Sequence, residues 1–207
     1  FSHRLELACK DSFVSATFLA VQEMLLRLYY LYEKSPKKSR ELKSIVDELK
    51  GVFELQKGGG YLPIRCQGTR WITHKRNAMQ RVMERYGAYI LHLTALINDS
   101  SVKAADKAQL KGYLKIWKAP KMLISCAMLF DALKPLSILS LVLQGNEVDI
   151  VMSIESTLNS LKALMLLLEK EPCQWPTVKL VKTRMKEIDG VMEYQGIPVE
   201  NFDECVQ

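Results

Sequence analysis

The sequence contains few of the residues and motifs that carry enzyme chemistry. It has three histidines among 207 residues. A P-loop, a G-x-G-x-x-G fingerprint and a G-x-S-x-G nucleophile motif are all absent. The glycine cluster Gly58 to Gly60 lacks the Lys-Ser/Thr pair that completes a phosphate-binding loop. These absences predict that the chain is not an enzyme on its own, with no catalytic residue and no cofactor.

Cysteine pairs at metal-binding or disulfide spacing are also absent. The five cysteines are scattered, and none belongs to a C-x-x-C pair: Cys9, Cys66, Cys126, Cys173 and Cys205. This usage predicts free thiols in a reducing compartment. Cys66 and His74 are close enough in sequence to share a metal, but such a pair lacks two of the four ligands of a structural zinc site. We therefore expect no bound metal.

No long hydrophobic run is free of charged residues. The most apolar run, residues 122 to 143, would be long enough to cross a bilayer, but Asp131, Lys134 and Pro135 lie at its centre. Charges at that depth are costly in lipid. The run therefore predicts a buried core helix with a proline kink rather than its alternative, a membrane span.

Positive charge, in contrast, is abundant and unevenly distributed. The net charge is +6. Residues 65 to 121 hold 12 basic and 3 acidic side chains, whereas residues 122 to 207 hold 7 basic and 12 acidic ones. A concentrated positive segment predicts a polyanionic partner such as nucleic acid. The alternative is an ordinary solvated helix surface.

Apolar residues recur at helical spacing along nearly the whole chain. Predicted helices cover residues 14–33, 36–50, 73–98 (capped by Thr73), a lysine-rich segment capped by Ser100 or Ser101, 120–143, 147–170 and 176–190. Only residues 52 to 68 look irregular. The prediction is a mostly α domain of about seven helices, with strand below ~10% of residues. Among the polar residues, His92 is expected to be a satisfied core residue.

Residues 65 to 76, RCQGTRWITHKR, combine a tryptophan with basic side chains and no acid. We predict that Trp71 is exposed and stacks on an unpaired base. Its basic neighbours would hold the nucleic-acid backbone: Arg65, Arg70, His74, Lys75 and Arg76. The alternative is that Trp71 packs against the 14–33 helix and the arginines only flank it.

A second basic feature follows on the lysine-rich helix. Lys103, Lys107, Lys111 and Lys115 repeat every four residues, so they share one helix face. Lys107, Lys111 and Lys115 are predicted to contact phosphates in weak DNA binding with little sequence preference. Simple solvation of the lysine face is the alternative.

Two short motifs resemble those of hAT-superfamily transposases. SHRLELACKD, residues 2 to 11, resembles the end of their C-x-x-H-x-L-x-L motif, with His3 as the motif histidine. GTRW, residues 68 to 71, resembles the Arg-Trp motif that follows in the same family. The resemblance covers most of the chain. The whole sequence resembles a vertebrate, zinc-finger-protein-like host protein derived from such an element.

The resemblance implies a multi-helix insertion domain attached to the edge of an RNase H-like core. Residues 1–13 would end the first part of that core, and residues 14–207 would form the insertion. The three catalytic carboxylates, the zinc finger and the dimerisation segment would lie outside this chain, which starts at Phe1 and is expected to be part of a longer protein. Two-metal phosphoryl transfer needs carboxylates from all three places, so the chain could not perform it. Trp71 would lie near a flipped base.

Two functions from different classes follow. The first is a nuclear, DNA-binding helical domain of a domesticated hAT-like protein, which forms any homo-oligomer through the full-length protein and does not enter a membrane. The second is a helical protein-interaction or dimerisation module with no DNA role, in which the apolar helices between residues 120 and 168 contact a partner or another copy.

Overall fold

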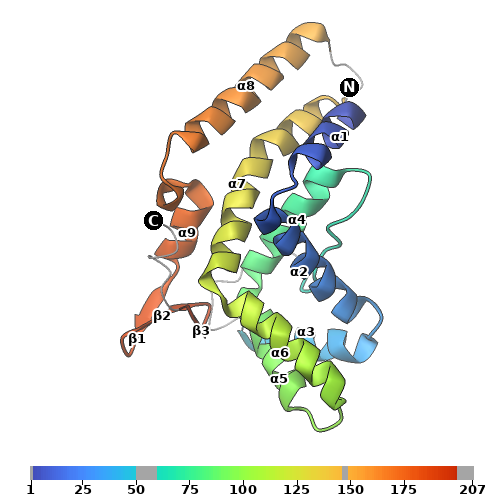
Figure 1. Cartoon of the computed structure of the whole chain (residues 1–207), viewed down its shortest axis with the longest axis vertical. Helices are drawn as coiled ribbons and strands as arrows, with labels where there is room; N and C mark the ends of the chain where they lie inside the picture. Colours follow the sequence, from blue (N-terminus) through green and yellow to red (C-terminus); the bar gives the residue numbers. More distant parts are fainter. Residues whose placement is uncertain (1, 50–59, 146–148, 200–207) are drawn as a thin grey trace.

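The computed structural model describes residues 2–49, 60–145 and 149–199 (Figure 1). This part of the chain forms α1 (Ser2–Ser12), α2 (Ala16–Glu33), α3 (Pro36–Leu49), α4 (Trp71–Glu84), α5 (Tyr86–Asn98), α6 (Ala104–Lys118), α7 (Pro120–Val142), α8 (Ile150–Leu168), the 3-10 helix η1 (Pro172–Gln174), α9 (Pro176–Thr183), β1 (Lys186–Ile188), β2 (Val191–Tyr194) and β3 (Ile197–Pro198). Helix accounts for 75% of the structure. The predicted mostly α class is therefore confirmed.

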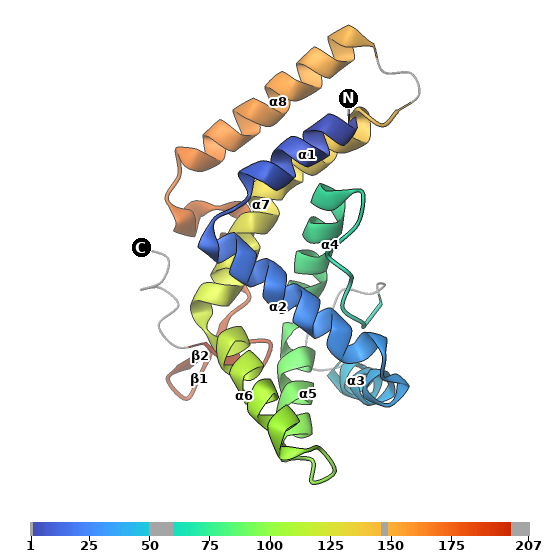
Figure 2. The same cartoon turned by 45° about the vertical axis from the view of Figure 1, so that its right-hand side comes forward.

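Helix α7 runs through the middle of the molecule, and most other helices pack on it (Figures 1 and 2). Helices α1, α2 and α4 lie on one side of it, and α9 lies on the other. Helices α5 and α6 pack together at the lower end, where α3 covers α5. Helix α8 lies along the outer edge and contacts α7. The core therefore follows α7 and reaches down between α2, α4 and α5.

Helix α7 is the core helix that the sequence predicts. Cys126, Ala127 and Leu133 are fully buried, and Leu139 is nearly so. Both α7 and α8 are long and apolar enough to span a bilayer, judged by length and composition alone. The two helices differ in burial. In α7, 56% of the most apolar stretch is buried, whereas in α8 only 11% of the corresponding stretch is buried.

The predicted helix over residues 73–98 is wrong in two ways. It begins at Trp71, with Arg70 rather than Thr73 at the N-cap position, and it is broken at Arg85 into α4 and α5. At the break the side-chain amide of Gln195 replaces the missing helical bond. Its Nε2 donates to the Met83 carbonyl at 2.7 Å, and its Oε1 accepts from the Gly87 amide at 3.0 Å. The predicted inward residues of this region are buried, as expected: Val82, Met83, Tyr86, Ile90 and Leu93.

The predicted helix over residues 176–190 is also wrong beyond Thr183. The chain turns into an antiparallel three-stranded sheet with the order β1-β2-β3. Asp189 and Gly190 both have positive φ, as the type I′ hairpin turn requires, and Asp-Gly is a preferred pair for that turn. Gln195 and Gly196 repeat this geometry between β2 and β3. The Asp-Gly pair was the available sequence signal.

The N-cap of α6 differs from the predicted one, and the segment before α4 is irregular as predicted. Lys103, not Ser100 or Ser101, stands at the N-cap of α6, because Ser101 instead donates its amide and hydroxyl to the Asp99 carboxylate, both at 2.8 Å. Residues 60–70 are irregular, as predicted. The rest of the glycine cluster, Gly58 and Gly59, lies outside the described residues.

Candidate functional surfaces

Trp71 is buried, which contradicts its predicted role as an exposed stacking residue. Its exposed fraction is 8%. The ring packs against Phe13 and against Phe18 of α2, with ring centroids 5.6 Å apart in both pairs. The alternative, that Trp71 packs against the 14–33 helix, is therefore correct, because Phe18 lies in α2. With an exposed fraction of 8%, Trp71 leaves little of its ring surface for a base to stack on.

Lys75 is buried too, so it cannot contact a phosphate as predicted. Its exposed fraction is 1%. The Nζ donates to the Cys66 carbonyl at 2.9 Å and lies 5.1 Å from the centre of the Trp71 ring. Burial lowers the pKa of this ammonium. Lys75 therefore ties the irregular segment before α4 to the aromatic cluster.

The other basic residues of this motif point to different surroundings. Arg65 and Arg70 are exposed. The Arg76 guanidinium stacks over Phe130 of α7 at 4.8 Å. The His74 ring lies against Gly68, where a Cβ atom would come within 2.4 Å of it. Most of the motif therefore packs against neighbouring helices. Among its basic side chains, only Arg65 and Arg70 are exposed.

Glu6 on α1 holds this motif together from the other side. It is 4% exposed, and its Oε2 accepts from the Ile72 amide at the start of α4 at 2.8 Å. Its Oε1 accepts from the Ser140 hydroxyl of α7 at 2.6 Å. A carboxylate at a helix N-terminus satisfies a free amide and complements the helix dipole. His3, the motif histidine on the same helix, is exposed.

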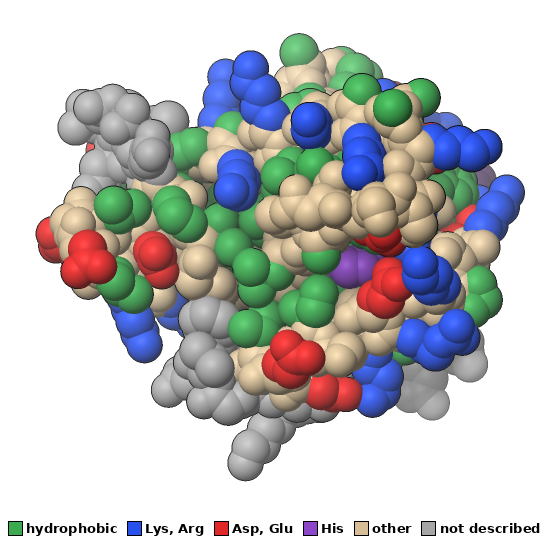
Figure 3. All heavy atoms as spheres, turned by 90° about the horizontal axis from the view of Figure 1, so that it is seen from below, with side chains coloured by type: hydrophobic (Ala, Val, Ile, Leu, Met, Phe, Trp, Pro, Cys, Tyr) green, Lys and Arg blue, Asp and Glu red, His purple; other side chains and the backbone are tan. Residues whose placement is uncertain are grey.

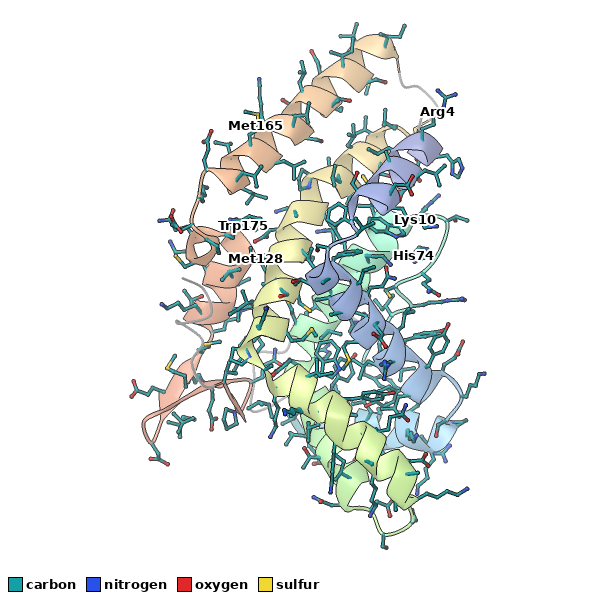
Figure 4. All side chains as sticks on the ribbon, viewed as in Figure 1. Arg4, Lys10, His74, Met128, Met165 and Trp175 are labelled. Atoms are coloured by element: carbon teal, nitrogen blue, oxygen red, sulfur yellow. The ribbon has the colours of Figure 1, made fainter. Side chains whose placement is uncertain are left out.

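A cavity of about 430 Å³ lies between α1, the start of α2 and residues 67–71. Phe13, Phe18 and Trp71 form much of its apolar wall, and Lys10 is an exposed charge at its edge. Figure 4 shows Lys10 and His74 on the same side of the molecule. The ammonium of Lys75 is covered, so Lys10 supplies the accessible positive charge.

The lysine face on α6 is accessible, as predicted. Lys111 and Lys115 are exposed and Lys107 is half-buried. No acidic side chain of the described residues lies within ion-pair distance of these three. Figure 3 shows the lower end of the molecule, where Lys and Arg side chains are interspersed with Asp and Glu. The lysines therefore form a stripe on one helix rather than a broad basic surface.

His92 is a satisfied core residue, as predicted. It is 1% exposed. Its Nδ1 pairs with the Tyr32 hydroxyl at 2.9 Å, and its Nε2 lies 3.3 Å from the Glu41 carboxylate. Burial lowers the pKa of the imidazole, while Glu41 opposes that shift. His92 thus joins α2, α3 and α5 in the lower core.

Within the described residues, no three His, Cys, Asp or Glu side chains come together as metal ligands. Cys9, Cys66 and Cys126 are buried free thiols, and Cys173 is an exposed one. Cys205 lies outside the described residues.

The outer surface of α8 belongs to the apolar helices between residues 120 and 168, which the second predicted function assigns to contact with a partner or another copy. Ser160 is the one buried residue of this helix. Its hydroxyl donates to the Pro135 carbonyl of α7 at 3.2 Å. Nine large apolar side chains are 46% to 79% exposed: Ile150, Val151, Met152, Ile154, Leu158, Leu161, Met165, Leu166 and Leu168. We call these nine residues the α8 face.

The α8 face is almost free of charge. Glu155 and Lys162 are the ionisable residues of the helix. Figure 4 shows Met165 pointing away from α7. Beside the first half of the face lies a groove of about 500 Å³, lined by Leu143 at the end of α7 and by Ile150, Ile154 and Leu158 of α8. The helix therefore offers an apolar ridge with an apolar groove next to it.

Comparison with known proteins gives no relative for this arrangement. No family model matches the sequence, no curated protein matches it, and no solved structure matches the fold.

Proposed function

We propose that the chain is a helical protein-association module that binds a protein partner through the α8 face. The observation that carries this proposal is the exposure of nine large apolar side chains on one helix. The apolar face of a helix is normally turned toward a core rather than toward solvent. Single exposed apolar residues need no explanation, but a contiguous set marks an interaction site.

The area of the α8 face supports a stable interface. A fully exposed Leu, Ile or Met side chain offers on the order of 100 Å² of apolar surface, so the nine partly exposed side chains offer roughly 500 Å². A standard interface buries about 800 Å² per partner, of which about 65% is apolar in homodimers. The α8 face alone therefore supplies the apolar share that such an interface needs.

The energy of covering this face is correspondingly large. Burying one such side chain completely is worth about 1.5–3 kcal/mol, so covering nine half-exposed ones gives roughly 7–13 kcal/mol before the entropy cost of association. Only two residues of this helix, Glu155 and Lys162, are ionisable. The partner is thus expected to present an apolar surface.

A photo-reactive amino acid at Ile154 tests the proposal in cells that express the chain. Ile154 is 55% exposed and lies at the edge of the groove. We expect protein adducts at this position. The adducts should be lost when Leu158→Gln and Met165→Gln make the α8 face polar. The matched control is the same amino acid at Gln109, an exposed position on α6. Lipid adducts alone, or protein adducts that survive the polar substitutions, would contradict the proposal.

A second candidate function is nucleic-acid binding, and the unpaired lysine stripe on α6 favours it. Lys107, Lys111 and Lys115 share one face, and no described acidic side chain lies within ion-pair distance of them. In this proposal the chain is the helical insertion domain of a nuclear, hAT-like protein, attached to an RNase H-like core. Arg65 and Arg70 would extend the contact. Trp71 would support the fold rather than stack on a base.

Salt dependence tests this second candidate. Replacing the three lysines by Gln should lower affinity for duplex DNA and reduce the slope of log K against log salt by about 0.9 for each phosphate that a lysine no longer neutralises. The three substitutions lie on a solvated helix face and should leave unfolding by urea unchanged. An unchanged slope would mean that the stripe is only solvated.

A further inference from the structure

The charges on α8 identify which partner its apolar face fits. This inference rests on the proposed association through the α8 face and adds the identity of the partner. Five exposed residues follow a spacing of four, three, four and three along the helix: Val151, Glu155, Leu158, Lys162 and Met165. This is the seam spacing of paired helices. The seam therefore holds three apolar residues and the two ionisable residues of α8.

We infer that the partner is a second copy of this chain, bound antiparallel through α8 about a two-fold axis near the middle of the helix. Glu155 and Lys162 lie on either side of Leu158, at nearly equal distances from that midpoint. An antiparallel pair therefore places Glu155 of one copy beside Lys162 of the other, twice over. A two-fold interface is self-complementary in this way.

A parallel pair and a lipid bilayer lack this match. In a parallel pair, Glu155 would face Glu155 and Lys162 would face Lys162, and like charges at such positions are unfavourable. In a bilayer, the two charges would face lipid at the centre of the helix, where charges are costly. Antiparallel pairing is the arrangement in which both charges are neutralised within an apolar surface.

The shape of the α8 face agrees with this pairing. The groove lies beside Ile150, Ile154 and Leu158, in the first half of the helix. In an antiparallel pair this half lies next to the second half of the other copy. That half carries Met165, 60% exposed, and Leu168, 79% exposed. Antiparallel pairing thus brings exposed apolar residues of both halves of the α8 face to the other copy.

Charge reversal in the purified chain tests the inference by sedimentation velocity over a range of concentrations. We expect the wild type to form a dimer. Glu155→Lys and Lys162→Glu should each raise the dissociation constant at least about tenfold, because each places two like charges together in both halves of the interface. An equimolar mixture of the two variants should form a heterodimer, and the double exchange should restore the homodimer.

Matched controls reverse exposed charges elsewhere on the chain. Glu187→Lys on β1 and Lys179→Glu on α9 change the net charge by the same amounts and should leave the dimer unchanged. A dimer that the α8 charge variants do not weaken would overturn the inferred pairing. A monomer at every concentration would also overturn it. If the chain is a monomer but Ile154 forms adducts with a different protein, the proposed function stands and only the inferred pairing is wrong. If the chain binds phosphatidylcholine vesicles instead of protein, both the proposed function and the inferred pairing are wrong.

Discussion

Arg70 and Trp71 are adjacent residues in opposite environments. Arg70 is exposed before the first turn of α4, whereas Trp71 is 8% exposed and packs against two phenylalanine rings. Their order in the basic motif suggests a joint role in nucleic-acid binding. Their surroundings separate the roles, because only Arg70 can meet a ligand without loss of core packing.

We predict that Trp71→Ala destabilises the fold by about 3–5 kcal/mol, the usual cost of removing a buried aromatic side chain. Arg70→Ala, the neighbouring control, should change stability by no more than about 0.5 kcal/mol. Urea unfolding followed by circular dichroism measures both. Equal stabilities for the two variants would mean that the cluster of Phe13, Phe18 and Trp71 does not contribute to the core.

His92 should make stability depend on pH. Burial lowers the pKa of the folded imidazole, whereas the unfolded one keeps a pKa of about 6.5. As the pH falls below 6.5, the unfolded state therefore binds more protons than the folded state. The contribution of neutral His92 to the free energy of unfolding is fully present above pH 6.5 and is lost as the pH falls. The loss between pH 6.5 and 5.5 is at most about 1.4 kcal/mol.

His92→Gln keeps a polar side chain at this position and removes the titration. Urea unfolding of the wild type and this variant at pH 7.5 and 5.5 measures the difference. The wild type should lose more free energy of unfolding than the variant over this interval. The same pH dependence in both proteins would assign the effect to other groups.

At the scale of elements, the break between α4 and α5 depends on close contact with the hairpin. A Cβ atom on Gly87 would lie 2.4 Å from the backbone oxygen of Gln195. Gly87→Ala should therefore push the hairpin away and cost about 1–3 kcal/mol. Gly112→Ala on α6 is the matched control, because nothing lies within 4 Å of its Cβ position. That change should stabilise the helix by about 0.5–1 kcal/mol. Destabilisation by both substitutions to the same extent would exclude hairpin contact as the cause.

Most helices could be predicted from sequence because their apolar residues recur with the helical period. The same helical period also indicates that Trp71 is buried. Trp71, Lys75, Ala78 and Val82 lie on one face at spacings of four, three and four, and all four are buried. Local composition suggested a solvated basic surface, but the tertiary contacts of Lys75 favoured burial. Helical periodicity was the better guide here.

The break at Arg85 could not be predicted in this way. The apolar period continues from α4 into α5, and the group that stabilises the break, Gln195, is 112 residues from Met83. Nor could the sequence indicate which side of α8 is covered. In the structure α7 covers the side of the helix that holds Ser160, so the nine apolar residues of the α8 face stay exposed.

At the scale of the whole molecule, association through α8 would link stability to concentration. Dimerisation stabilises the folded state by mass action. The melting temperature of the wild type should therefore rise with protein concentration, whereas that of Glu155→Lys should stay constant over the same range. Differential scanning calorimetry at several concentrations measures this. A melting temperature that is constant for both proteins would argue against a dimer in solution.

The Gln195 contact also affects how the chain can fold during synthesis. The ribosome adds about 5–20 residues per second, so the 112 residues between Met83 and Gln195 take roughly 6–22 s to follow. During that interval the Met83 carbonyl and the Gly87 amide can bond to each other, as they would in one continuous helix. The nascent chain would thus carry a straight helix over residues 71–98, and this helix would bend only after the C-terminal hairpin has been made.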